Sequence, residues 1–434
     1  MRKVLILCPT RREFRDLPEL AKQLDCELAF DDFGGDYFDR FLGKNAQPTD
    51  EVLDIVSLID ETVAHYKDAG LSGATSGVGY PGMSASSLIA KKLGIHGGNP
   101  EPIITFDHKY YSRLAQQKYV PEATPSFYLI DPKDLKTLDA VNDFPAFLKP
   151  VKSCMSKNAY RISSKEELEK RVKEALLPEG FITPFNDMVA NYTGLELHAS
   201  YLLVESLLEG AQVSLEGYVH DGKVHVMGIV DALFFPGTIS FKRFQYPSKL
   251  PEEVQHRMIG IAEKLMTGIG YDNAPFNIEM MYNPDSHQIH IIEVNPKLAS
   301  QFPDLFLKVD GTSSYSVLLQ LAIGEKPKFT RRQGEFKIAA SCVLRLFEDQ
   351  YVQAVPSQEQ INALRAKYPD ALIELYAPLG KNLSDQMQDA ESFRYGLVNI
   401  GAQCERELEE KFEFFKGSLQ FKFAPVHEPS ASRH

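Results

Sequence analysis

The stretch FNIEMMYNPDSHQIHIIEVNPK, residues 276–297, decides the fold, because two apolar runs flank a polar turn and predict a β-hairpin. Each predicted strand carries one acid, Glu279 or Glu293. Asn295 lies two residues beyond Glu293 and therefore points to the same face of its strand. Two carboxylates and a carboxamide oxygen suit a hard cation such as Mg²⁺, which also keeps water and phosphate oxygens as ligands. The hairpin therefore predicts a metal site.

The opposing interpretation of this hairpin is a half-exposed strand pair whose acids face only solvent. The apolar run HII at 290–292, directly before Glu293, favours the metal site, since an ordinary strand end would carry neutral residues there. Lys297 follows Asn295 at the next position on the same face and adds positive charge. The segment thus combines two acids, an amide and a cation.

The bulk composition is that of a soluble globular protein with more than one core. The chain has 434 residues, of which 44% are hydrophobic and 24% charged, so we expect two to four domains or subdomains. The net charge of −12 argues against a nucleic-acid partner, because phosphate backbones need a basic surface. A small basic site for a nucleotide is still compatible with it.

Cysteine usage and hydropathy indicate the compartment. The 5 cysteines are widely spaced and form no CxxC pair, which predicts neither a disulfide framework nor a zinc site and favours a reducing compartment. No stretch approaches the roughly 20 apolar residues that span a bilayer. The apolar run at 4–8 is too short for a signal peptide and predicts a strand. We therefore expect a cytoplasmic protein without a membrane partner.

The order of elements predicts an α/β fold. Strands that alternate with helices over residues 1–104 indicate a parallel sheet in an N-terminal α/β domain. Residues 180–198 resemble a loop, and the polar tail EPSASRH at 428–434 is expected to be disordered. Further helices are expected at 14–24, 50–69, 84–93, 105–120, 164–177, 251–269 and 312–323, and strands at 126–130, 146–150, 201–206, 212–220, 223–231, 275–282 and 287–294.

Four motifs in this order resemble the ATP-grasp superfamily. The run IIEVNPK at 291–297 closes the hairpin, and DHK at 107–109 places a lysine after an aspartate on a predicted helix. Lys149 ends the strand PAFLKP, and Glu205 ends the strand YLLVE. The resemblance covers about residues 1–330, and the following region is more loosely similar to the C-terminal region of biotin-carboxylase-like members.

The resemblance implies an ATP-grasp architecture in three parts. These are an N-terminal α/β domain at 1–104, a two-part grasp domain at 105–330 with a small lid subdomain at about 125–205, and a mixed α/β region at 331–434. It also implies that ATP binds between the two halves of the grasp domain.

A set of nucleotide contacts follows from the resemblance. Lys109 and Lys149 would bind phosphates as point charges, and the backbone of Leu207 would read the adenine edge. Glu205 would accept a hydrogen bond from the adenine amino group or pair elsewhere. Gln212 stands where relatives usually carry an acid that binds ribose, and its amide can hydrogen-bond hydroxyls as well.

The metal and transition-state roles are implied in the same way. Glu279, Glu293 and Asn295 would hold Mg²⁺ or Mn²⁺. Lys297, where relatives commonly carry arginine, and Arg243 would stabilise the acyl-phosphate oxygens. A surface arginine without such a role is the opposing interpretation of Arg243.

The loop after Lys149 departs from the family. Relatives have a glycine-rich loop whose amides cover the phosphates, but the segment VKSCMSKNAY at 151–160 has no glycine. The hydroxyls of Ser153 and Ser156 and the charges of Lys152 and Lys157 could take over part of that function.

The expected activity is an ATP-dependent ligase that couples a small-molecule carboxylate to an amine through an acyl phosphate. Two alternatives stay open. One is a biotin-carboxylase-like subunit, although LASQF at 298–302 stands where that family holds bicarbonate. The other is a non-catalytic nucleotide-binding protein of the same fold, which Lys297 and the glycine-free loop would support. The oligomeric state stays open, and a homodimer, which is common among relatives, is one candidate.

Overall fold

A computed structural model describes two compact units of the chain. The described residues are 2–33, 52–153, 158–175, 177, 179–386 and 392–426. The first unit consists of Met1–Val230, Ser248–Pro303 and Ser313–Phe329, and the second of Asp231–Pro247, Asp304–Thr312 and Thr330–His434. Helices and strands alternate in both units, which confirms the α/β class, whereas the domain boundaries at 104 and 330 stay predictions. The tail 428–434 lies outside the described residues.

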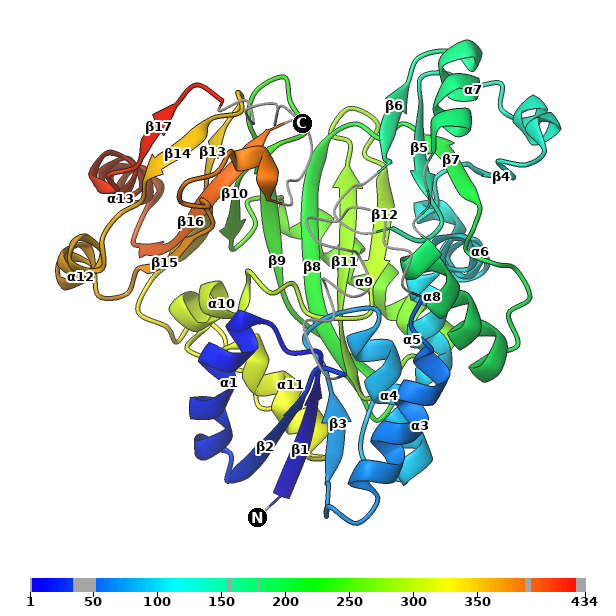
Figure 1. Cartoon of the computed structure of the whole chain (residues 1–434), viewed down its shortest axis with the longest axis horizontal. Coiled ribbons are helices and arrows are strands. Elements are labelled where there is room, and N and C mark those ends of the chain that lie inside the picture. Colours follow the sequence, from blue (N-terminus) through cyan, green and yellow to red (C-terminus); the bar gives the residue numbers. More distant parts are fainter. Residues whose placement is uncertain are drawn as a thin grey trace, which may run out of the picture. The chain divides into compact units, whose positions relative to one another are not determined.

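The first unit begins with a parallel sheet of three strands in the order β2-β1-β3. Its central strand is a continuous apolar run that is buried from Val4 to Leu7, as the sequence predicts for a parallel strand. Figure 1 shows α1 beside β2, and α4 and α3 beside β3. The elements are β1 (Arg2–Leu7), α1 (Arg11–Gln23), β2 (Cys26–Asp31), α3 (Ile55–Tyr66), β3 (Gly73–Thr75) and α4 (Gly82–Leu93).

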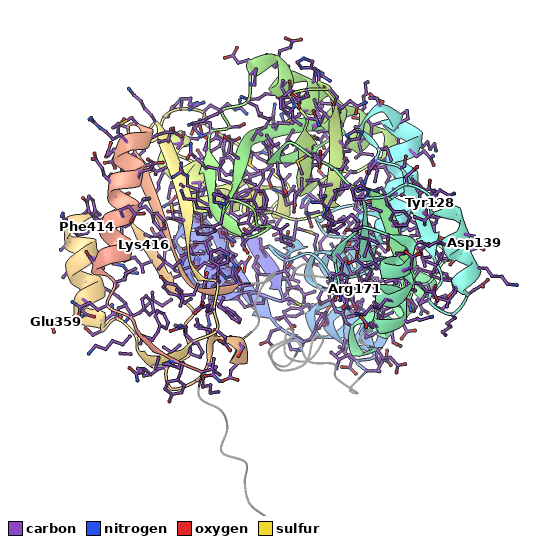
Figure 2. All side chains as sticks on the ribbon, turned by 90° about the horizontal axis from the view of Figure 1, so that it is seen from above. Tyr128, Asp139, Arg171, Glu359, Phe414 and Lys416 are labelled. Carbon is purple, nitrogen blue, oxygen red and sulfur yellow. The ribbon has the colours of Figure 1, made fainter. Side chains whose placement is uncertain are left out.

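The next part of the first unit is a small antiparallel sheet in the order β4-β7-β5-β6. Its apolar face forms a core of its own with α7 and η3. Figure 2 labels three residues of this part, Tyr128, Asp139 and Arg171. The elements are η2 (Pro121–Ala123), β4 (Phe127–Ile130), η3 (Leu135–Ala140), β5 (Ala146–Pro150), β6 (Tyr160–Ile162), α7 (Lys165–Glu174) and β7 (Leu202–Ser206).

Two sequence predictions in this region are wrong. The segment 180–198 is largely helical, as α8 (Glu179–Tyr192), because Phe181, Phe185 and Met188 form a buried stripe at helical spacing that Pro184 obscured. The helix expected at 105–120 is two helices, α5 (Pro100–Asp107) and α6 (Lys109–Tyr119). They are separated by His108, whose backbone is extended.

The central sheet of the first unit has the order β12-β11-β8-β9. The two hairpins predicted from sequence are confirmed, and positive φ angles of 50° at Asp221 and 69° at Gly222 fit the tight turn between β8 and β9. The helices α9 and α11 also belong to the first unit. The elements are β8 (Ala211–His220), β9 (Lys223–Phe234), α9 (Glu252–Ile269), β11 (Ala274–Tyr282), β12 (Ile289–Asn295) and α11 (Ser314–Ala322).

The second unit contains the end of β9 and an antiparallel arrangement in the order β10-β13-β16-β15. One face is apolar and packs against α12 and α13. Figure 2 shows Glu359 on α12, with Phe414 and Lys416 on the neighbouring α13. The elements are β10 (Phe241–Tyr246), α10 (Pro303–Asp310), β13 (Ile338–Leu346), β14 (Tyr351–Ala354), α12 (Gln358–Lys367), β15 (Leu372–Leu375), η4 (Leu383–Asp385), β16 (Phe393–Ala402), α13 (Glu405–Ser418) and β17 (Lys422–Ala424). Among the described helices, none combines the length and apolar character that crossing a membrane requires.

Candidate active site

Two rows of polar residues cross β8, β11 and β12 in the first unit. One row is Ser214, Glu279 and Glu293, and the other is Glu216, Asn277 and Asn295. Glu279 is paired directly with Glu293, and Asn295 is paired with Asn277, two residues before Glu279. Directly paired residues point to the same face of a sheet, and so do residues two apart. The two acids and the amide therefore share one face, and Nδ2 of Asn295 lies 3.3 Å from Oε1 of Glu279. The structure thus brings together the three residues that the sequence assigns to a metal.

The pKa values of the two acids are shifted in opposite directions. Burial and the negative charge of Glu293 raise the pKa of Glu279 to about 7. Burial would also raise the pKa of Glu293, but Lys109 and Lys149 outweigh it, so this pKa is lowered. Nζ of Lys109 lies 2.7 Å from Oε1 of Glu293. Glu279 also accepts a hydrogen bond from the Nε2 group of Gln212 at 3.1 Å.

Lys109 is the first residue of α6, and its neighbour His108 fixes that position. Nδ1 of His108 accepts the backbone N–H of Tyr111 at 3.4 Å, so Nε2 carries the proton and donates to the carbonyl of Leu197 at 3.2 Å. Burial lowers the pKa of His108 to about 4, so the ring is neutral near pH 7. The backbone N–H of Lys109 donates to the carbonyl of Val151 at 3.1 Å, which ties α6 to the end of β5.

Arg113 is a site residue that the sequence reasoning missed. Its Nε lies 2.7 Å from Oε1 of Glu205, and its Nη2 lies 3.1 Å from Oε2 and donates to the carbonyl of Ile292 at 2.7 Å. The spacing of one helical turn after Lys109 is the signal that could have found it. Nζ of Lys149 lies 2.7 Å from Oε2 of the same Glu205.

The side chains of Arg113, Glu205 and Lys149 form a buried charged cluster. Burial would raise the pKa of Glu205, but the two cations lower it to about 2. Both carboxylate oxygens accept charged donors, which matches the pairing stated for Glu205, and its contact with adenine stays a prediction. Burial lowers the pKa of Lys149 although Glu205 opposes this shift.

The glycine-rich turn after β3 lies close to Lys297. A Cβ placed on Gly79 would be 3.2 Å from Cδ of Lys297 and 3.8 Å from Oδ1 of Asp107. Asp107 forms an ion pair of 3.0 Å with Lys152, whose ammonium group lies 4.6 Å from the centre of the Tyr80 ring. Lys152 is therefore held by Asp107 and Tyr80, and its contribution to phosphate binding stays a prediction.

The remaining predicted site residues lie on separate segments of the chain. Leu207 directly follows β7, and Ser153 follows β5, where its carbonyl lies 3.4 Å from Nζ of Lys109. Ser156 lies outside the described residues. Arg243 is buried in the second unit on β10, with Nη1 3.6 Å from Glu409 of α13, and its catalytic role stays a prediction.

A parallel N-terminal sheet, a small antiparallel sheet and a central sheet with two paired acids define an ATP-grasp fold. Residues 142–302 match the family model of an ATP-grasp domain, so this part of the chain is an ATP-grasp domain. This confirms the resemblance found in the motifs.

Solved structures resemble the fold over its whole length. The L-amino acid ligase from Bacillus licheniformis has a TM-score of 0.72 and 15% identity over 98% of this chain and 99% of that chain. Phosphoribosylglycinamide synthetase from Anaerococcus prevotii has a TM-score of 0.66 and 18% identity over 98% and 100%. The biotin carboxylase domain of Hydrogenobacter thermophilus 2-oxoglutarate carboxylase, solved with MgADP and bicarbonate, has a TM-score of 0.65 and 13% identity over 97% and 91%. No curated protein sequence matches the chain.

Proposed function

We propose that the protein is an ATP- and Mg²⁺-dependent ligase that activates a carboxylate as an acyl phosphate and joins it to an amine. The observation that carries this proposal is the face shared by Glu279, Glu293 and Asn295, with Lys109 in contact with one of its acids. The ATP-grasp family supports the use of ATP.

The residues present fit Mg²⁺ by their chemistry. Two carboxylates and a carboxamide on one face supply oxygen ligands, and burial together with the charge of Glu293 raises the pKa of Glu279. Among the described residues, no three His, Cys, Asp or Glu side chains form a metal-binding group. Fewer protein ligands suit Mg²⁺, which keeps waters and phosphate oxygens. When bound, Mg²⁺ supplies charge neutralisation to the phosphate oxygens.

Two lysines would bind the phosphates. Lys109 forms an ion pair with Glu293 and would bind a phosphate as a point charge in the nucleotide complex. Lys149 is held against Glu205 at the end of β5, on the strand that leads into the loop at 151–160. The backbone of Leu207, which follows β7, would bind the adenine edge.

The chemistry follows in two displacements. A carboxylate oxygen of the substrate attacks the γ-phosphorus, the bond to the β–γ bridging oxygen breaks, and ADP leaves with that electron pair. The amine nitrogen of the second substrate then attacks the acyl carbon, the carbon–oxygen bond to phosphate breaks, and the amine loses a proton. Lys297 would stabilise the acyl-phosphate oxygens as a point charge.

An amino acid is the substrate class with the most support. The L-amino acid ligase is the similar structure with the highest TM-score among those described above, at 0.72. A ligase of this kind needs a binding site for each substrate near Lys297. The turn at Gly79 lies beside that lysine and is our candidate for part of such a site.

The test is ADP release measured with pairs of carboxylates and amines drawn from the amino acids. At least one pair should stimulate release, and Glu293→Gln should abolish it, whereas Glu253→Gln on the exposed face of α9 should not change it. Release stimulated by bicarbonate and free biotin would instead establish the carboxylase alternative. Binding of ATP with Mg²⁺ but no stimulation by any pair would establish the non-catalytic alternative.

A further inference from the structure

Glu216 on β8 is a fully buried carboxylate that the proposed chemistry does not use. Its Oε2 accepts the backbone N–H of Ala299 at 2.7 Å and the Nδ2 group of Asn277 at 3.3 Å. Burial raises the pKa of this carboxyl to about 7. Because a buried acid is costly, its presence here calls for a specific partner.

The partner of Glu216 is the turn that carries Lys297. This turn leaves β12 at Asn295, whose carbonyl accepts the backbone N–H of Lys297 at 2.8 Å. Ala299, two residues further on, is held by Glu216, and its own carbonyl accepts the backbone N–H of Phe302 at 2.9 Å. Lys297 therefore stands between two anchored residues, one in the sheet and one bound by Glu216.

A second path leads from Glu216 to the proposed metal site. Asn277 is paired with Glu216 on β8 and with Asn295 on β12, so the three side chains form one row across three strands. The row lies next to that of Glu279 and Glu293. Glu216 therefore lies in one row with Asn295 and also binds the residue two positions after Lys297.

We propose that Glu216 is a positioning residue, which holds the turn at 295–299 so that Lys297 and Asn295 keep their places at the reacting phosphate. The 2.7 Å bond from the backbone N–H of Ala299 fixes this turn to a side chain that is itself completely buried on β8. The proposal deepens the proposed function and rests on it.

Three variants separate the parts of this proposal. Glu216→Ala removes the anchor, whereas Glu216→Gln keeps the shape and one acceptor oxygen. Asp272→Asn is the matched control, since Asp272 also accepts backbone N–H groups, from Gly222 at 3.1 Å and Asn273 at 2.8 Å, at the other end of β11. All three are compared as full-length proteins.

The first measurement is hydrogen exchange of the backbone amides at 295–302. Glu216→Ala should lose protection at Ala299, Glu216→Gln should keep most of it, and Asp272→Asn should leave it unchanged. This measurement needs no turnover, so it decides whether Glu216 anchors the turn even if the wild type proves inactive. Unchanged protection at Ala299 in both Glu216 variants would overturn the proposal.

The second measurement is the rate with the best substrate pair. Misplacing a catalytic group by about 1 Å costs about 10²-fold, so Glu216→Ala should lower kcat by roughly that factor while the KM for ATP stays within about twofold. In a Lys297→Met background, Glu216→Ala should lower kcat much less than it does in the wild type, because the ammonium group that the turn positions is then absent. Equal losses of kcat and ATP affinity, or fully additive effects with Lys297→Met, would overturn it.

Discussion

The buried ion pair between Arg113 and Glu205 leads to a quantitative prediction for Arg113→Met. The side chains are 2% and 5% exposed, and the change removes contacts of 2.7 and 3.1 Å to Glu205 and one of 2.7 Å to the carbonyl of Ile292. Removal of one partner of a buried pair costs about 3–5 kcal/mol when the other charge is left unpaired, and because Glu205 keeps Lys149 at 2.7 Å, the lower end of that range, about 3 kcal/mol, applies here. We expect a loss of this size in the free energy of unfolding, measured with urea.

A matched control lies in the small antiparallel part of the same unit. Lys165 and Asp139 form an ion pair of 2.8 Å, but their side chains are 47% and 75% exposed. Lys165→Met should therefore cost less than about 1 kcal/mol. Adding Glu205→Leu to Arg113→Met should not recover the loss, because buried Lys149 then loses its ion pair with Glu205. If Arg113→Met costs no more than Lys165→Met, the account of this cluster is refuted.

Two further predictions concern residues around the site. The unfolded state binds a proton at His108 near pH 6.5 and the folded state only near pH 4, so the free energy of unfolding should fall by about 1.4 kcal/mol per pH unit as the pH drops through that window. His108→Asn, which keeps a capping oxygen, should remove this slope in urea titrations at each pH, and an unchanged slope would contradict the assignment. Gly77→Ala should destabilise the first unit by more than about 2 kcal/mol, because its Cβ would lie 1.9 Å from Oε1 of buried Glu13. Gly194→Ala, with nothing within 4 Å of its Cβ, is the control, and equal Tm values for both variants would argue against this packing.

The elements with a clear period could be predicted from the sequence. The hairpin at 276–297 alternates around a polar turn, and the strand at 146–150 is a short apolar run bounded by prolines, so both are found where expected. Helix α8 was missed because Pro184 interrupts a pattern whose apolar residues become meaningful only when they pack against Tyr80.

The candidate site was predictable where its residues are neighbours in sequence. Glu279 and Glu293 belong to one hairpin, whose register follows from a short turn. Arg113 and Glu205 are 92 positions apart, and Glu216 and Asn277 are 61 apart, so their contacts depend on how distant segments pair. A single sequence carries no local signal for such contacts.

Binding of ATP measured by titration calorimetry, with and without Mg²⁺, tests the central claim most directly. The wild type should bind ATP much more tightly with Mg²⁺, because Glu279, Glu293 and Asn295 then share the metal with the phosphates. Glu293→Gln should lose this dependence on Mg²⁺ while it remains folded. If ATP binds the wild type equally well without Mg²⁺, or if Glu293→Gln keeps the full dependence, these residues do not form the metal site.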